Sequence, residues 1–173
     1  YTFAAGVQPQ ITLDAASALG RGRTEDCELS VDNQRREITG STRMFGSFSK
    51  RYGGLPVYFV ARFRTPWTTC RRWTDRADHF DPQLASGDGS GVVCDFEKSA
   101  APQAIELAVA LSHVSIANAR DNLEVELGER SFDEVRQAAT AEWDAMLSSV
   151  QIEGGTAAEQ TMFYTALFRA FSM

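Results

Sequence analysis

The sequence predicts an antiparallel β-sandwich followed by helices, and three observations carry this prediction. Short β-rich runs separated by Gly- and Pro-containing turns fill residues 1–114. After that point the spacing of apolar residues changes from 2 to 3.6, the period of an α-helix. Residues 156–173 are apolar around most of their helical circumference, which is typical of a helix buried on all sides.

The strands of the predicted sandwich are short and bounded by turn residues. In VYFVARF, residues 57–63, alternate apolar side chains fall on one face: Val57, Phe59, Ala61 and Phe63. We expect this run to be a strand with that face in the core. The other predicted strands are residues 11–14, 27–31, 36–42, 43–49, 92–96 and 105–114.

Three helices are predicted after the strands. The first has an apolar face made of Ile116, Ala119, Leu123 and Leu127. The second begins at a capping box, in which Ser131 and Glu134 each satisfy a backbone N–H near the helix start. Its apolar stripe consists of Phe132, Val135, Ala139, Trp143, Met146 and Val150, and Trp143 is predicted to be core. Thr156 and Glu159 form a second capping box, where the last helix is expected to begin.

The composition limits the function classes. With 173 residues, 43% hydrophobic and 23% charged, the chain is long enough for one folded domain. Its net charge of −6 argues against nucleic acid or an anionic membrane surface as a partner. No apolar run reaches the roughly 18 residues of a membrane span. The chain begins at Tyr1 without an initiator Met or a signal pattern, so we expect a piece of a longer protein, cut at both ends.

The cysteines and histidines form no recognisable site. Cys27, Cys70 and Cys94 lack the C-x-x-C spacing of a zinc or redox site, and we interpret them as buried thiols. One disulfide among them is the alternative if the protein is exported, and the sequence does not choose the pair. His113 is expected to fix a strand-to-helix turn by a hydrogen bond, and His79 to be solvated in a polar loop.

Three strings resemble a known family: LSHVSIANARDNLEVEL, FDEVRQAATAEWDAMLSSVQIEGG and FYTALFRA. They resemble the segment that joins the two domains of family 92 glycoside hydrolases, which are calcium-dependent, inverting exo-α-mannosidases. The resemblance is specific over residues 105–169 and looser over the strands VYFVARF and GVVCDF. It implies a galactose-mutarotase-like supersandwich over residues 1–114 and a helical linker over 115–155. Residues 156–173 would be the first helix of a truncated (α/α)6 barrel.

The resemblance also implies where the chemistry lies. In this family the general acid, the general base and the calcium ligands come from the barrel, so no catalytic or metal-binding residue carries over to this chain. The longer protein is expected to be an exo-α-1,2-mannosidase that acts on mannose-containing glycans and uses calcium. It is expected to be secreted, periplasmic or on the cell surface. The isolated chain is expected to be inactive and to bind no calcium.

The acidic residues offer no catalytic pair of their own. An inverting glycosidase holds two carboxyls roughly 6.5–9.5 Å apart across a cleft. Asp121 and Glu124 share a helical face opposite the apolar one and are interpreted as solvated, while Glu126 points to another side. Residues 86–91, SGDGSG, contain one acidic residue and are predicted to form a hairpin turn rather than a calcium loop.

Aromatic rings are the remaining route to sugar binding, because pyranose faces stack on exposed rings. Tyr52, Trp67 and Trp73 are predicted to lie in or near loops, where each ring would first of all anchor its loop. If a ring contacts sugar, Trp67 or Trp73 is the candidate. The nearby hydrogen-bond donors are Arg71 and Arg72.

Two alternatives to the family 92 interpretation stay open. One is a stand-alone carbohydrate-binding sandwich, and the other is the sandwich domain of a different (α/α)6 glycosidase or of a disaccharide phosphorylase. The apolar last helix counts against an independent module, because it would leave a large apolar surface uncovered. Without a barrel, that helix is expected to fold back on residues 132–150 or to pair with the same helix of a second copy, and we favour the pairing.

Overall fold

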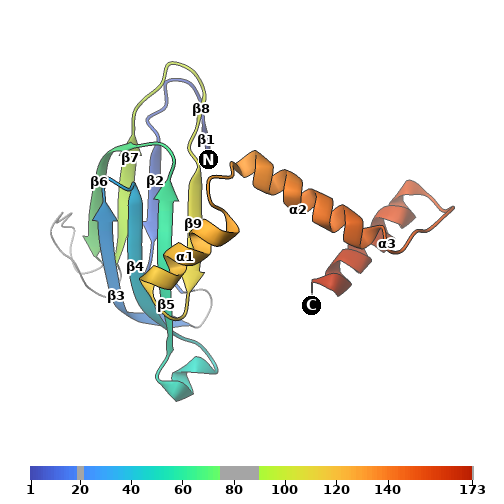
Figure 1. Ribbon diagram of the computed structural model, residues 1–173, viewed down its shortest axis with the longest axis horizontal. Helices are drawn as coiled ribbons and strands as arrows, with labels where there is room; N and C mark the ends of the chain where they lie inside the picture. The colour runs from blue at the N-terminus through green and yellow to red at the C-terminus, as the bar shows by residue number, and fades with distance from the viewer. Residues whose placement is uncertain (19–21, 75–89, 173) are drawn as a thin grey trace. The chain divides into compact units, whose positions relative to one another are not determined.

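The computed structural model of the chain describes residues 1–18, 22–74 and 90–172. It contains two compact units, Tyr1–Glu129 and Arg130–Met173. The first holds the strands and one helix, and the second holds two helices (Figure 1).

The first unit is a sandwich of two antiparallel sheets. The three-stranded sheet has the order β2-β7-β6, with β2 (Gln10–Asp14), β7 (Ser90–Phe96) and β6 (Trp67–Thr74). The four-stranded sheet has the order β3-β4-β5-β9, with β3 (Arg23–Asp32), β4 (Glu37–Phe45), β5 (Leu55–Phe63) and β9 (Leu107–Ser112). A short pair, β1 (Thr2–Phe3) with β8 (Gln103–Ala104), adds to one end. The prediction of an antiparallel sandwich is confirmed.

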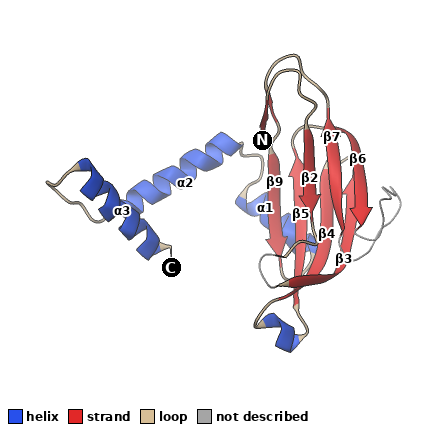
Figure 2. Cartoon of the chain, turned by 180° about the vertical axis from the view of Figure 1, so that it is seen from behind, coloured by secondary structure: helices blue, strands red, loops and turns tan. Residues whose placement is uncertain are grey.

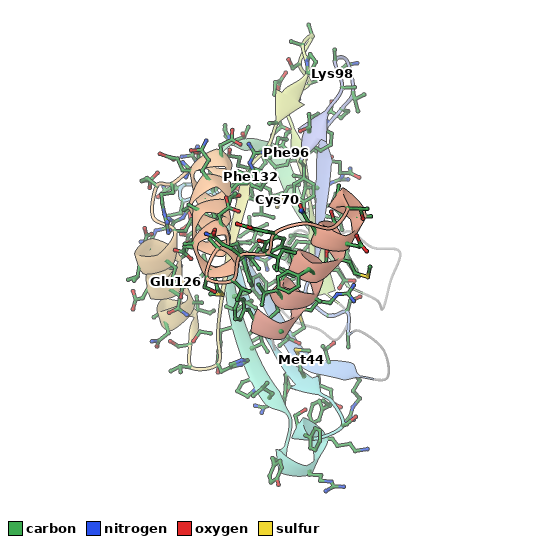
Figure 3. The ribbon with its side chains drawn as sticks, turned by 90° about the vertical axis from the view of Figure 1, so that its right-hand side faces the viewer. Met44, Cys70, Phe96, Lys98, Glu126 and Phe132 are labelled. Atoms are coloured by element: carbon green, nitrogen blue, oxygen red, sulfur yellow. A yellow bond between two sulfur atoms is a disulfide. The ribbon has the colours of Figure 1, made fainter. Side chains whose placement is uncertain are left out.

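The main core lies between the two sheets. From β5, alternate residues are buried, as the spacing in VYFVARF predicts: Val57, Phe59, Ala61 and Phe63. The facing side chains of the other sheet are Ile11, Val92, Cys94 and Phe96. The rings of Phe63 and Phe96 meet with centroids 5.2 Å apart. In Figure 3, Cys70 and Phe96 lie in the middle of the sandwich, between Met44 towards one end and Lys98 towards the other.

The opposite face of the four-stranded sheet is covered by α1 (Ile116–Glu126), which crosses β5 and β9 (Figure 1). Ala119 and Leu123 of α1 pack with Val60 of β5, and all three side chains are buried. The helix begins where Ser115 accepts a hydrogen bond from the backbone N–H of Asn118 at 3.1 Å. The predicted apolar face of this helix is therefore confirmed, and β5 is buried on both sides.

Two strand predictions need correction. Residues 36–42 and 43–49 are not separate strands, because β4 runs without a break to Phe45. The chain then forms a hairpin tip with the short 3-10 helix η1 (Ser49–Tyr52), which projects from the sandwich (Figure 1). The pattern also fails to predict β6, because polar residues dominate its sequence, WTTCRRWT, and hide the period of two.

The second unit contains α2 (Phe132–Leu147) and α3 (Ala157–Phe171). Both predicted capping boxes are present. The backbone N–H of Ser131 donates to Glu134 at 2.7 Å, and that of Thr156 donates to Glu159 at the same distance. Between the helices, Gly154 and Gly155 adopt positive φ angles of 79° and 72°, which favour glycine and break the helical run. Both predicted helix starts are confirmed.

The two helices contact each other through Trp143 and Phe168, whose ring centroids lie 4.4 Å apart. Trp143 is only half-buried, so its prediction as a core residue is wrong for the chain as it stands. Several apolar side chains of these helices are exposed, Phe168 among them; the others are Phe132, Met146, Met162 and Phe171. The domain boundaries after residues 114 and 155 stay a prediction, although α1 falls within the same compact unit as the strands.

Candidate functional site

The β2-β7-β6 sheet has an outer face whose residues follow from strand register. Cys70 on β6 lies opposite Cys94 on β7, and the two form a disulfide that packs in the core. Their neighbours therefore project to the other side of the sheet. We call this side the outer face; its residues are Gln10, Thr12, Asp14, Thr69, Arg71, Trp73, Gly91, Val93 and Asp95. Figure 2 shows these three strands from the side opposite to α1.

Asp95 organises one end of the outer face. Its carboxylate accepts hydrogen bonds from Gln10 Nε2 at 2.8 Å, Thr69 Oγ1 at 2.8 Å and Arg71 Nη2 at 3.0 Å. The hydrogen bond from Gln10 contributes most to lowering the pKa of Asp95; burial opposes it, and Thr69 and Arg71 lower the pKa further. The side chain is 20% exposed, so this anchored carboxylate still reaches solvent.

Trp73 occupies the other end of the outer face. It lies opposite Gly91 on β7. A Cβ placed on Gly91 would come within 2.5 Å of the ring atoms Cε2 and Cζ2 of Trp73. The indole therefore rests directly on the backbone of β7, and only glycine leaves room for it there. Trp73 is partly exposed and is the second-last residue of β6.

Trp67 is the first residue of β6, directly after a loop, and its surroundings differ from those of Trp73. A bulge between Trp67 and Thr69 turns the Trp67 ring towards the core, where it packs edge-on against Phe63 with centroids 5.8 Å apart. Its indole N–H donates to Asn33 Oδ1 at 2.8 Å. Trp67 thus anchors the strand, while Trp73 lies on a face that a ligand can approach.

The two candidate donors, Arg71 and Arg72, lie on opposite faces of the sheet because successive residues of a strand point to opposite sides. Arg71 lies opposite Val93 on the outer face, beside Trp73 and Asp95. Arg72 lies opposite Val92, a core residue, and so belongs to the other face. The structure therefore joins Trp73 with Arg71 and separates Arg72 from them. Sequence reasoning missed Asp95, Thr69 and Gln10, which only strand pairing brings to this face.

A second polar cluster ties the four-stranded sheet to α1. Glu37 on β4 is 1% exposed and is held by two arginines. Arg62 Nε and Nη2 donate to Glu37 Oε1 at 3.0 and 2.6 Å, and Arg120 Nε and Nη2 donate to Oε2 at 3.1 and 2.9 Å. Burial alone would raise the pKa of Glu37, but the hydrogen bonds and charges of Arg120 and Arg62 together hold it below its usual value.

Glu124 completes this cluster. Arg62 Nη2 also donates to Glu124 at 2.6 Å, and this contact raises the pKa of Arg62. Glu124 is therefore half-exposed and paired, rather than simply solvated as the sequence predicts. The cluster borders a surface cavity of about 420 Å³. Both carboxylates are held by guanidinium groups, and the cluster acts as a clamp between β4, β5 and α1.

The cysteines and His113 have structural surroundings. Cys70 and Cys94 form a disulfide, so the prediction of three buried thiols is wrong for this pair, while Cys27 is buried in the core. The Nδ1–H of His113 donates to the carbonyl of Pro56 at 2.9 Å, which agrees with its predicted structural role. Tyr52 projects from η1. The predictions for His79 and for most of residues 86–91 lie outside the described residues.

The described residues contain neither a metal-binding cluster nor a membrane-spanning helix. Within residues 1–18, 22–74 and 90–172, no three His, Cys, Asp or Glu side chains gather in a way that could hold a metal ion. None of the helices found in that part of the chain has the length and apolar character needed to span a bilayer.

Comparison with sequence families gives two matches that together cover most of the chain. Residues 1–112 match the model described as the glycosyl hydrolase family 92 N-terminal domain. Residues 118–173 match the model described as the glycosyl hydrolase family 92 catalytic domain. The first match ends with β9, and the second begins at residue 118, in the first turn of α1. No match is found among curated proteins.

Solved structures agree with the family matches. The GH92 family glycosyl hydrolase CcMan5 shares 30% identity over 97% of this chain, with a TM-score of 0.73. The GH92 inverting mannosidase BT2199 of Bacteroides thetaiotaomicron VPI-5482 shares 20% identity over 94%, with a TM-score of 0.77. The GH92 α-mannosidase BT3965 of Bacteroides thetaiotaomicron shares 24% over 98%, with a TM-score of 0.78. The chain covers 22%, 21% and 23% of these three structures, about a fifth of their length.

Proposed function

The chain belongs to glycosyl hydrolase family 92, and on that premise we propose that it is part of an inverting exo-α-1,2-mannosidase acting on mannose-containing glycans. The observation that carries this proposal is the pair of adjacent family matches, N-terminal domain and then catalytic domain. Two structural relatives are described as mannosidases, one of them as inverting. BT3965 has also been solved in complex with mannoimidazole.

Within such an enzyme, this chain supplies a scaffold rather than the reacting groups. Inversion uses one carboxylic acid and one carboxylate on opposite sides of the scissile bond. Glu37 and Glu124 are both neutralised by Arg62, and Glu37 is also held by Arg120. Neither carboxylate is placed to donate a proton to a leaving group. We therefore expect the isolated chain not to hydrolyse mannosides.

We propose that the calcium expected for a family 92 enzyme is held by residues outside this chain. The ion takes six to eight oxygen ligands, several of them carboxylates. The acidic residues of the described segments do not gather in this way. They do not fit a calcium site, and no step of the reaction is assigned to the ion here.

The exposed apolar residues of α2 and α3 need a partner. In a longer protein we expect the rest of the catalytic domain to cover them, since the catalytic-domain match includes both helices. In the isolated chain the same surface favours self-association through α3. A groove on the α2–α3 pair, lined in part by Leu147, Tyr164 and Phe168, offers a place for an apolar side chain from a second copy.

Export of the protein is proposed from the cysteines. Cys70 and Cys94 form a disulfide between neighbouring strands, and such bonds persist in secreted or periplasmic proteins and on cell surfaces. We propose one of these locations. Mass spectrometry of the native protein after alkylation without reductant tests whether the disulfide persists. Alkylation of both Cys70 and Cys94 would contradict the proposed location.

The mannosidase proposal is tested on the longer protein that contains this chain. It is incubated with α-1,2-linked mannobiose and calcium, and the first mannose released is followed by proton NMR. We expect mannose to appear first as the β-anomer, because inversion at an α-linkage produces it. Release of the α-anomer, or no release from any α-mannoside, would contradict the proposal.

A further inference from the structure

We propose that the outer face of the β2-β7-β6 sheet binds a neutral oligosaccharide, with Trp73 as a stacking platform and the Asp95 cluster as its polar end. The choice of a mannose-containing ligand rests on the proposed function, whereas the platform itself rests on the geometry of this face.

The indole of Trp73 is held in place before any ligand arrives. One side of the ring rests on Gly91, whose missing side chain allows this close contact. A ring supported by backbone loses little conformational freedom on binding, so more of the contact energy appears as affinity. Indole combines a large apolar surface with a polar N–H, which suits a ligand that has both C–H faces and hydroxyl groups.

Asp95 and its partners supply the groups that hydroxyls recognise. A carboxylate, an amide, a hydroxyl and a guanidinium lie together, fixed by hydrogen bonds of 2.8–3.0 Å. Gln10, Thr12 and Thr69 are exposed, and Arg71 and Asp95 are partly exposed. Acceptors and donors therefore stand side by side, which matches the alternating demands of a sugar hydroxyl.

The spacing suits more than one sugar unit. Gly91 and Asp95 are four residues apart on β7, so the Trp73 end and the Asp95 end are separated by roughly 13 Å at the usual rise per strand residue. Between them, Thr12 and Arg71 flank the nearly buried Val93. A hexopyranose stacked on Trp73 would thus place a neighbouring unit over Thr12 and towards Asp95.

The charges on this face favour a neutral ligand. Asp95 is paired with Arg71 at 3.0 Å. Asp14, near Trp73, is engaged locally by the backbone N–H groups of Ala16 and Ser17 at 3.0 Å. Arg71 is offset by Asp95 and Asp14 adds a negative charge, so a phosphate or another polyanion finds no unbalanced positive patch here. Charge complementarity therefore points to a neutral, hydroxyl-rich partner.

The test is native affinity electrophoresis of the chain in gels that contain soluble α-mannan. We expect the mannan to retard the wild-type chain. Trp73→Ala should remove the retardation, with an increase in dissociation constant of roughly tenfold or more. Thr12→Lys should do the same by placing a long side chain over the platform, and it leaves the contact of Trp73 with Gly91 intact. Tyr52→Ala is the matched control, since it removes an exposed ring from η1 and should change nothing.

Two results would overturn the proposal. One is unchanged retardation in both Trp73→Ala and Thr12→Lys, and the other is no retardation of the wild-type chain at any mannan concentration. Circular dichroism of each variant shows whether it is folded. If Trp73→Ala is unfolded, the retardation of Thr12→Lys decides whether the outer face binds mannan. The assay has no catalytic readout, so its failure would leave the mannosidase proposal to be judged on hydrolysis by the longer protein.

Discussion

Arg120 and Glu37 lie 83 residues apart in the sequence and meet in a two-point ion pair, with Nε and Nη2 of Arg120 at 3.1 and 2.9 Å from Glu37 Oε2. Glu37 comes from β4 and Arg120 from α1, so this pair ties the helix to the sheet. Because the carboxylate is almost fully buried, its ionised form depends on the two arginines that surround it.

Glu37→Gln should destabilise the first unit. The substitution leaves Arg62 and Arg120 without their shared counter-charge, and breaking a buried pair costs roughly 3–5 kcal/mol. The two guanidiniums are 24% and 31% exposed, and water screens part of the loss, so we expect about 2–3 kcal/mol. Urea unfolding followed by tryptophan fluorescence measures it. Glu25→Gln, in an exposed pair with Arg23, is the control and should cost less than about 1 kcal/mol.

The same pair predicts a pH dependence. The pKa of Glu37 is lower in the folded chain than its ordinary value of 4.5, so its contribution to stability is fully present above that value. It is lost as the pH falls through the lower, folded pKa. The stability gap between wild type and Glu37→Gln should be constant from neutral pH to about 5 and shrink in more acidic solution. A gap that widens on acidification would contradict the clamp.

Gly40→Ala should disrupt the packing of β4. A Cβ at Gly40 would lie 2.4 Å from the carbonyl oxygen of Glu28 and 2.7 Å from Phe59 Cε1, and the backbone oxygen cannot move aside easily. We expect a loss of roughly 1–3 kcal/mol in the free energy of unfolding. Gly46→Ala is the matched control, because its nearest contact would be 3.7 Å, and it should change stability by less than about 0.5 kcal/mol. Equal effects would mean that β4 and β5 are not packed as described.

The exposed apolar side chains of α3 should make the isolated chain associate with itself. Met162, Phe168 and Phe171 are 67%, 43% and 43% exposed, and burying one large apolar side chain contributes roughly 1.5–3 kcal/mol. Light scattering should therefore show a larger species for the full chain than for a version that ends at Gly155. If both are monomeric and equally soluble, the contact of α3 with α2 is sufficient and its exposed apolar side chains do not drive association.

The parts of the fold that the sequence predicts are those specified locally. A capping box needs only residues three apart, and so Ser131 with Glu134 and Thr156 with Glu159 mark their helix starts correctly. The alternation in β5 is readable for the same reason. Strand β6 cannot be predicted in this way, because its core-facing positions include Arg72, which breaks the apolar period.

The candidate sites depend on contacts between distant residues, which explains why only part of them is predictable. Trp73 and Arg71 are candidates by residue type alone. Their partners Asp95 and Gln10 join them through the pairing of β6 and β2 with β7, which no local pattern specifies. The Glu37 cluster combines residues from β4, β5 and α1, and a single sequence carries no sign of that arrangement.

The most direct test of the account is the activity of the isolated chain. Its central claim is that this part of a family 92 enzyme folds and presents surfaces, while the reacting carboxylates come from elsewhere. The purified chain, shown to be folded, is incubated with an aryl α-mannoside and with α-1,2-mannobiose in the presence of calcium. We predict no release of mannose above background. Turnover that disappears in Glu124→Gln or Asp121→Asn would contradict the claim and place the active site on α1.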